Sequence, residues 1–190
     1  MRIIGGSKRR MNLFSPPGLD SRPITDRVKE SLFNVLANYG LPAGRMVSDL
    51  FAGVGSLGLE AISRGAGFVA FVEQNPKIVP ILKRNIEKAG FIKQSKVIRA
   101  DAFKIAIPVD AEHPECDLVF VDPPYVDSAH TRAGSPLVTL LIRLSEQIAS
   151  GCFVVVRTQE NTSLPQSYGQ LKIIDRRQWG TMAVTILKKE

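Results

Sequence analysis

The chain has 190 residues, of which 44% are hydrophobic and 23% are charged. These values suit one globular domain, and no run approaches the roughly 18 apolar residues that would predict a membrane span. The net charge of +7 is concentrated in residues 1–29, which hold seven basic and two acidic side chains, and this asymmetry predicts a polyanionic partner. Because the first residues lack the apolar core of a signal peptide, we expect a cytoplasmic protein.

The N-terminal residues predict a small basic extension. Residues 2–4 and 11–14 can pair as a hairpin, and residues 25–38 have the apolar periodicity of a helix with Thr25 as its N-cap. We therefore expect residues 1–38 to form a hairpin and helix extension that contacts the polyanionic partner. Residues 39–190 would then form the main domain.

From residue 46 onward, apolar strands alternate with amphipathic helices. The expected strands are 46–51, 68–73, 96–100, 118–121, 152–157, 171–176 and 183–188. Helices are expected from Leu57, with Pro76 in the first turn of the next one and Gly90 at its end, and over residues 137–149. The pattern predicts a Rossmann-like, doubly wound α/β fold. Its seven-stranded sheet would be mostly parallel, with an antiparallel C-terminal strand.

A glycine-rich loop follows the first strand. The stretch DLFAGVGSLGLEA (49–61) contains the pattern G-x-G-x-x-G, whose glycines let the backbone turn tightly and approach a ligand. The helix that follows would present unpaired N–H groups to an anionic group. Glu73, at the end of the second strand, can accept both hydroxyls of an adenosine ribose. These features fit a nicotinamide dinucleotide and S-adenosylmethionine equally well.

Three further features separate the two cofactors. Asp49 directly precedes the glycines, where its carboxylate would repel a pyrophosphate but could bind the ammonium of a methionine moiety. Asp101 and Ala102 follow the third strand, and Asp101 could hydrogen-bond an adenine amino group. The fourth strand leads into Asp122-Pro-Pro-Tyr125, which in this topology faces the glycine loop across the switch point.

The DPPY motif suits chemistry on an exocyclic amine. Prolines donate no N–H, so the carbonyl groups beside them stay available as acceptors. Together with the Asp122 carboxylate, they can hold the two hydrogens of an amino group on a base. This arrangement directs the nitrogen lone pair outward and offsets the charge that develops during attack. Tyr125 offers a flat face on which the base can stack.

Together these motifs resemble a known family. DxFAGxGxxG after the first strand and DPPY after the fourth resemble the motifs of Rossmann-like S-adenosylmethionine methyltransferases that act on exocyclic amines. RIIGG (2–6), RPITDRVKESLFN (22–34), DLFAGVGSLGLEA (49–61) and FVDPPY (120–125) are similar to the bacterial 16S ribosomal RNA guanine-N2 methyltransferases. The resemblance covers essentially the whole chain. Ile24 replaces a common Thr, and Lys8-Arg9-Arg10 replaces a W-R-G-R-like run.

The resemblance implies direct methyl transfer from S-adenosylmethionine to guanine N2, with no metal and no covalent enzyme intermediate. It implies 16S rRNA or the assembling small subunit as partner, and a monomeric enzyme. The residues expected at the cofactor are Asp49, Phe51, Ala52, Gly53, Gly55, Glu73, Asp101, Ala102 and Asp122. The catalytic residues expected at the guanine are Asp122, Pro123 and Tyr125. The residues expected to contact RNA are Arg9, Arg10, Arg22, Thr25 and Arg27.

Three alternatives stay open. An adenine-N6 methyltransferase acting on DNA or RNA would share the DPPY motif. A dehydrogenase would share the glycine loop, but it would leave DPPY without a role. A non-catalytic RNA-binding module could keep the same fold, although the intact Asp122 and glycine loop argue against it.

Overall fold

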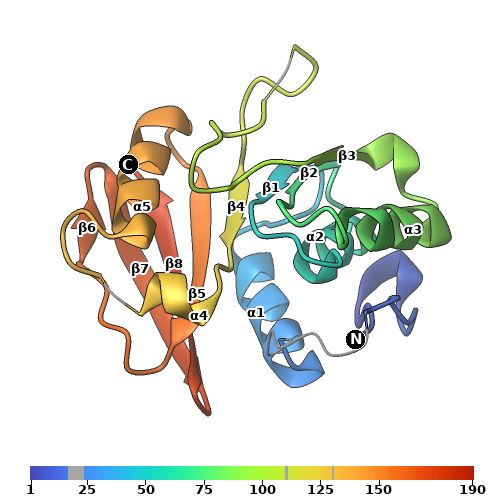
Figure 1. Ribbon diagram of the computed structural model, residues 1–190, viewed down its shortest axis with the longest axis horizontal. Coiled ribbons are helices and arrows are strands. Elements are labelled where there is room, and N and C mark those ends of the chain that lie inside the picture. The colour runs from blue at the N-terminus through green and yellow to red at the C-terminus, as the bar shows by residue number, and fades with distance from the viewer. Residues whose placement is uncertain (17–23, 110, 130) are drawn as a thin grey trace.

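A central sheet with helices on both faces forms the molecule (Figure 1). The computed structural model describes residues 1–16, 24–109, 111–129 and 131–190. In these residues the eight strands lie in the order β3-β2-β1-β4-β5-β8-β7-β6, which runs from right to left in Figure 1. The strands are β1 (Met46–Asp49), β2 (Phe68–Val72), β3 (Ser95–Ile98), β4 (Leu118–Val121), β5 (Phe153–Gln159), β6 (Ser167–Tyr168), β7 (Leu171–Trp179) and β8 (Met182–Lys189).

The first five strands are parallel, and β8 pairs antiparallel with β5. The predicted Rossmann-like fold with an antiparallel C-terminal strand is therefore confirmed. The helices are η1 (Gly6–Lys8), α1 (Asp26–Asn38), α2 (Ser56–Ser63), α3 (Val79–Ala89), η2 (Ile92–Gln94), α4 (Tyr125–Ser128) and α5 (Pro136–Gln147). None of the helices in the described residues combines the length and the apolar character needed to cross a bilayer.

Several element ends differ by a few residues from the sequence-based expectations; for example, β1 ends at Asp49 rather than at residue 51, and β7 ends at Trp179 rather than at residue 176. In the described residues the sheet has eight strands rather than seven, because the two-residue β6 pairs with β7 and is too short to leave a periodic signal. Pro76 precedes α3 instead of lying in its first turn. The carbonyl of Asn75 accepts the N–H groups of Ile78 and Val79, so the chain first makes a turn and the helix begins at Val79.

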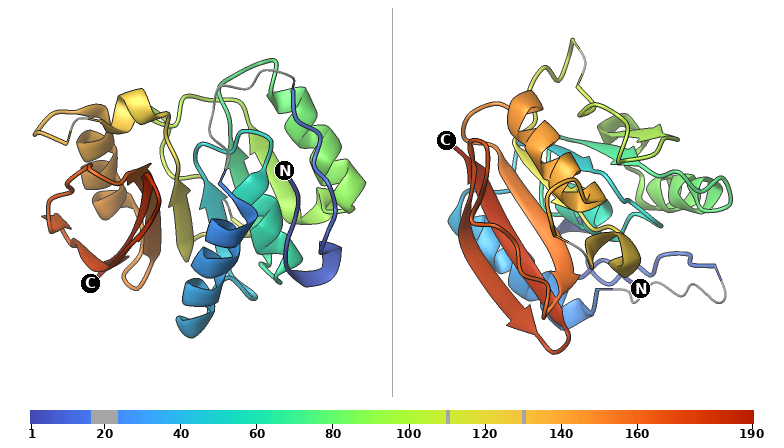
Figure 2. Two further views of the ribbon diagram at one scale, coloured as in Figure 1. Left: turned by 90° about the horizontal axis from the view of Figure 1, so that it is seen from below. Right: turned by 60° about the vertical axis from the view of Figure 1, so that its left-hand side comes forward.

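Alternating side chains of the strands enter two separate cores. On β4, Leu118 and Phe120 pack in the core shared with α1, α2 and α3, whereas Val119 and Val121 pack with α5. Figure 2 shows α1 and α5 on opposite faces of the sheet. The apolar character of β4 on both faces follows from this double coverage, as is typical of central parallel strands.

The N-terminal residues form the expected hairpin. Arg2 and Asn12 make an antiparallel bridge, and the N–H of Ile3 donates to the carbonyl of Met11 at 2.9 Å. Ile3 is fully buried in the core that contains α1 and α2. The expected N-cap of α1 is also present, since Thr25 Oγ1 accepts the N–H of Val28. The division of the chain at residue 38 stays a prediction.

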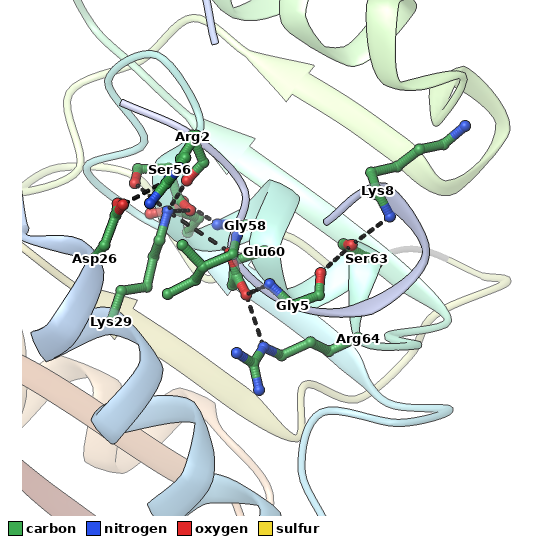
Figure 3. A network of polar contacts seen from close by, with 12 residues as sticks. Arg2, Gly5, Lys8, Asp26, Lys29, Ser56, Gly58, Glu60, Ser63 and Arg64 are labelled. Atoms are coloured by element: carbon green, nitrogen blue, oxygen red, sulfur yellow. Dashed lines mark hydrogen bonds and ion pairs between the residues drawn. The ribbon is translucent and has the colours of Figure 1, made fainter. Parts of the chain in front are cut away.

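A buried lysine ties α1 to both the N-terminal residues and α2 (Figure 3). The side chain of Lys29 is fully buried, and its Nζ donates to the carbonyl of Arg2 at 2.7 Å and to Ser56 Oγ at 3.2 Å. The same Nζ lies 3.6 Å from the Glu60 carboxylate. Burial lowers the pKa of Lys29, and the Glu60 charge opposes that effect.

Glu60 is the acceptor at the centre of this network. Its two carboxylate oxygens accept the N–H groups of Ile4 and Gly5, each at 2.8 Å. Arg64, one helical turn further along α2, pairs with it at 2.7 Å. The backbone of the N-terminal segment is therefore hydrogen-bonded directly to the helix that follows the glycine loop.

This network predicts a large loss of stability when its cation is removed. Lys29→Met leaves the Glu60 carboxylate buried with one charge fewer beside it, and should lower the free energy of unfolding by about 3–5 kcal/mol in urea denaturation. Lys83→Met, on the exposed face of α3, is the matched control and should change it by less than about 0.5 kcal/mol. The double variant Lys29→Met/Glu60→Leu should recover part of the loss, and no recovery would contradict the role given to the pair.

Candidate functional site

A cavity of about 710 Å³ lies at the carboxyl ends of the parallel strands. It brings together the loop after β1, the end of β2, the residues after β3 and the DPPY motif after β4. Of the residues expected at the site, it is lined by Phe51, Ala52, Gly53, Glu73, Ala102, Asp122, Pro123 and Tyr125. The sequence motifs therefore meet in one cavity, as the switch-point argument predicts.

Three of the expected cofactor residues, Gly55, Asp101 and Asp49, do not line this cavity. Gly55, at φ 93°, is the N-cap of α2, and a Cβ there would approach Leu82 to 2.7 Å. Asp101 Oδ1 accepts the N–H of Phe103 at 3.0 Å, which holds the turn after β3. Asp49 lies beneath the glycine loop and is only 1% exposed.

Asp49 is a buried acid with a raised pKa. Its Oδ2 accepts the N–H of Gly58 at 2.9 Å, whereas its buried Oδ1 has no hydrogen-bond partner in the described structure. Burial raises the pKa of Asp49 to about 7, opposed by the Gly58 N–H and reinforced by the charges of Asp122 and Glu73. An ammonium group near Oδ1 would supply the missing donor and favour the ionised form, so Asp49 fits the amino end of a methionine moiety.

Glu73 connects the end of β2 to the glycine loop. One of its carboxylate oxygens accepts the N–H of Gly53 at 2.9 Å, and the other accepts the N–H of Asn75 at 2.7 Å. Each oxygen of an ionised carboxylate has two lone pairs, so both keep an acceptor site for a hydroxyl group. Phe51 packs edge-on against Phe103, with their ring centroids 5.0 Å apart, beside Ala102. This arrangement fits an adenosine.

Asp122 is fixed by an arginine that the sequence motifs did not identify. Arg157 Nε donates to Asp122 Oδ1 at 2.5 Å, and both side chains line the cavity. Arg157 directly follows Val156, which pairs with Val121 in the sheet. Burial raises the pKa of Asp122, and the Arg157 charge opposes that effect. The one feature of the sequence that indicates Arg157 is its position as a basic residue directly after the apolar run 153–156 of β5.

The rest of the DPPY motif lies at the mouth of the cavity. Pro123 is buried, and Tyr125 is half-buried at the first position of α4. This four-residue helix was too short to be expected from periodicity. It turns the chain away from the sheet immediately after the motif.

The expected RNA-contacting residues do not form a single group. Arg9 and Arg10 lie in the turn after η1, where the N–H of Lys8 donates to Ser63 Oγ at 2.9 Å. Ser63 ends α2, whereas the glycine loop adjoins its start, and a helix of eight residues is about 12 Å long. Thr25 and Arg27 lie at the start of α1 instead. Arg22 falls outside the described residues.

Comparison with known proteins gives consistent matches over the full length. A family model described as Conserved hypothetical protein 95 matches residues 1–188. "Ribosomal RNA small subunit methyltransferase D" of Escherichia coli is 32% identical, over 100% of this chain and 90% of that protein. "Putative rRNA methyltransferase YlbH" of Bacillus subtilis is 34% identical, over 100% and 99%. The solved structure of "Putative methyltransferase yhhF" from Escherichia coli is 29% identical over 100% and 98%, with a TM-score of 0.82.

The family expected from the four sequence motifs is thus confirmed by matches that extend far beyond those motifs. The chain belongs to the family of the ribosomal RNA small subunit methyltransferases D, described as Conserved hypothetical protein 95.

Proposed function

We propose that this chain transfers the methyl group of S-adenosylmethionine to the exocyclic N2 of a guanine in 16S rRNA. As a member of its family, the chain is an S-adenosylmethionine-dependent rRNA methyltransferase. The observation that carries the finer proposal is the shared cavity, in which Asp122-Pro-Pro-Tyr125 lies opposite Gly53 and Glu73. As substrate we propose 16S rRNA, naked or within the assembling small subunit, and we expect the enzyme to act as a cytoplasmic monomer.

The residues of the cavity divide between cofactor and substrate. Asp49 and Glu73, with Ala102, would hold the cofactor, which supplies a methyl group on a positively charged sulfur. Asp122 and the carbonyl groups beside the prolines would accept the two hydrogens of the target amine and so orient its lone pair. Arg157 holds the Asp122 carboxylate in place. Positioning of the two reactants in this way can supply much of the rate enhancement of a methyl transfer.

The raised pKa of Asp122 adds to this role. Because burial disfavours the ionised form, the Asp122 carboxylate accepts a proton more readily than an ordinary aspartate. The amine nitrogen loses a proton when it gains the methyl group. Asp122 is the residue of the DPPY motif that would accept this proton. Tyr125 would stack on the guanine and hold its plane. A guanine in a folded RNA must leave its stack to reach this cavity.

The decisive experiment is product analysis. Labelled S-adenosylmethionine would be incubated with unmodified 16S rRNA and, separately, with small subunits, followed by mass spectrometry of the nucleosides. We expect N2-methylguanosine at one position. N6-methyladenosine would contradict the guanine assignment and favour the adenine-N6 alternative.

Turnover should depend strongly on Asp122. In Asp122→Ala we expect the single-turnover rate to fall by about 10²- to 10³-fold with little change in cofactor affinity, because a preorganised acceptor is lost at the reacting nitrogen. Asp122→Asn should be milder, since its amide oxygen still accepts a hydrogen bond. Asp127→Ala, on α4 outside the cavity lining, is the control. Full activity of Asp122→Ala would mean that the carbonyl groups alone orient the amine.

Cofactor affinity should depend on pH through Asp49. A carboxyl with a pKa raised to about 7 loses its charge as the pH falls through that value, so binding of a cationic amino group should weaken from about pH 8 to about pH 6. Well below this pKa, the affinity for the cofactor should fall by about tenfold for each pH unit. Titration calorimetry should show weak, nearly pH-independent binding in Asp49→Asn. Glu73→Ala should also bind weakly but keep the pH dependence. The same pH profile in Asp49→Asn as in the wild type would exclude Asp49 as the titrating group.

The basic turn gives a separate prediction on RNA affinity. The side chains of Arg9 and Arg10 are exposed and have no ion-pair partner in the described part of the chain. Arg9→Glu/Arg10→Glu should weaken RNA binding and reduce the slope of log affinity against log salt by about one unit per lost phosphate contact. Filter binding at several salt concentrations measures this slope. Lys83→Glu/Lys93→Glu makes the same change of charge elsewhere, and an equal loss there would show that only net charge matters.

A further inference from the structure

A second cavity of about 710 Å³ adjoins the cofactor cavity. Three segments that are distant in the sequence line it, namely the start of α1, the start of α4 and the turn between β7 and β8. The β7–β8 hairpin, in red in Figure 1, projects beyond the end of β5. Tyr125 lines both cavities, so the two meet at its side chain.

An indole ring forms one wall of this second cavity. Trp179, the last residue of β7, is half-buried and packs against the core shared with α1. Its neighbours are Gly180, at φ 59°, and Thr181, which together make the turn to β8. The ring is therefore held by the fold while part of it stays exposed to the cavity.

A cationic side chain also lines this cavity. Arg27, from the first turn of α1, is exposed and has no ion-pair partner in the described residues. Gln178 precedes Trp179 in β7, so its side chain lies on the other face of the strand, where its Nε2 donates to the carbonyl of Glu160 at 3.3 Å. The cavity thus combines a stacking surface with a cation.

This combination favours an unpaired nucleotide as the occupant. Single-stranded RNA is recognised by aromatic rings that stack on its bases, by arginines that contact its phosphates and by polar groups that reach its base edges. An apolar peptide would leave Arg27 unsatisfied, whereas the phosphate of a nucleotide complements it. A base within a duplex could not stack on Trp179, because its faces are already covered by its neighbours.

We propose that this cavity binds the nucleotide next to the methylated guanine, with its base stacked on Trp179 and its phosphate paired with Arg27. The inference rests on the proposed function, because it requires that the target guanine packs against Tyr125 from the side of the cofactor cavity. The adjacent nucleotide of the strand is then the one that reaches the opposite side of Tyr125. The enzyme thus reads an unpaired dinucleotide step rather than an isolated base.

The chain contains one tryptophan, so its tryptophan fluorescence comes from Trp179 alone. The probe is a short unpaired oligoribonucleotide that contains guanine, titrated into the full-length protein. Stacking should quench the fluorescence of Trp179 in a saturable and salt-sensitive way. S-adenosylmethionine alone, and a duplex of the same sequence, should leave the fluorescence unchanged. Equal quenching by the duplex, or none by the unpaired strand, would overturn the proposal.

Variants test the same cavity by affinity. Trp179→Ala should weaken binding of the unpaired strand by about 5- to 150-fold, the range expected for loss of one base–aromatic stack. Trp179→Phe keeps an aromatic ring and should lose much less, which guards against a simple folding defect. Ile174→Ala, an exposed apolar residue of β7 outside the cavity, is the matched control and should bind normally. Equal affinity of Trp179→Ala and the wild type would overturn the proposal.

The role of Arg27 is tested through salt. Arg27→Gln should reduce the slope of log affinity against log salt by about one unit, whereas Arg177→Gln, on β7 outside the cavity, should not. An unchanged slope in Arg27→Gln would exclude the phosphate contact.

Failure of this inference can be told apart from failure of the proposed function. Methylation of rRNA with an unchanged KM for RNA in Trp179→Ala would overturn the nucleotide site and leave the proposed function in place. Quenching of Trp179 by unpaired RNA, without any methylated guanosine in the wild type, would support the nucleotide site and contradict the guanine-N2 assignment.

Discussion

The parallel pairing of β1 with β4 is the constraint on which the site depends. Asp49 lies opposite Phe120 in this pair, and the N–H of Leu50 donates to the Phe120 carbonyl. From β1 the chain proceeds to β2 and β3 on one side, and it returns to β4 on the other. The helices after β1 and β4 therefore pack on opposite faces of the sheet, which leaves a crevice between the glycine loop and the DPPY motif.

The elements predicted from sequence are those with a strong local signal. β4 agrees with its expected bounds, because an uninterrupted apolar run between polar loops has few other interpretations. The glycine loop and DPPY could be placed because each follows such a strand. Arg157 could not be recognised, since its role comes from a neighbour that lies 35 positions away in the chain. The location of Arg9 beside the end of α2 likewise depends on a tertiary hydrogen bond at Lys8.

The buried network around Lys29 explains why the N-terminal segment takes a defined place. Removing a charged pair from water costs free energy, so a buried pair stabilises the fold only when its remaining donors and acceptors are hydrogen-bonded. Here the backbone of Arg2, Ile4 and Gly5 supplies those partners. Ser56, which accepts from Lys29, also lines the cavity at the carboxyl ends of the parallel strands. The N-terminal residues and the end of the glycine loop are thus parts of one hydrogen-bonded unit.

The distribution of charge separates the two kinds of ligand. Arg157 pairs with Asp122 at the cavity, whereas the carboxylate of Glu73 lines the cavity and raises the cost of placing a phosphate beside it. The excess of basic side chains lies outside the cavity, mostly before residue 30. In the proposed reaction, an RNA strand would therefore be attracted to the surface, whereas a cationic cofactor would be favoured beside Glu73. The base of a nucleotide carries no charge, so it would enter the cavity at a lower electrostatic cost than a phosphate, and Asp122 would accept hydrogens from its amine. Selection for a base that has left its stack would then follow from charge as well as from shape.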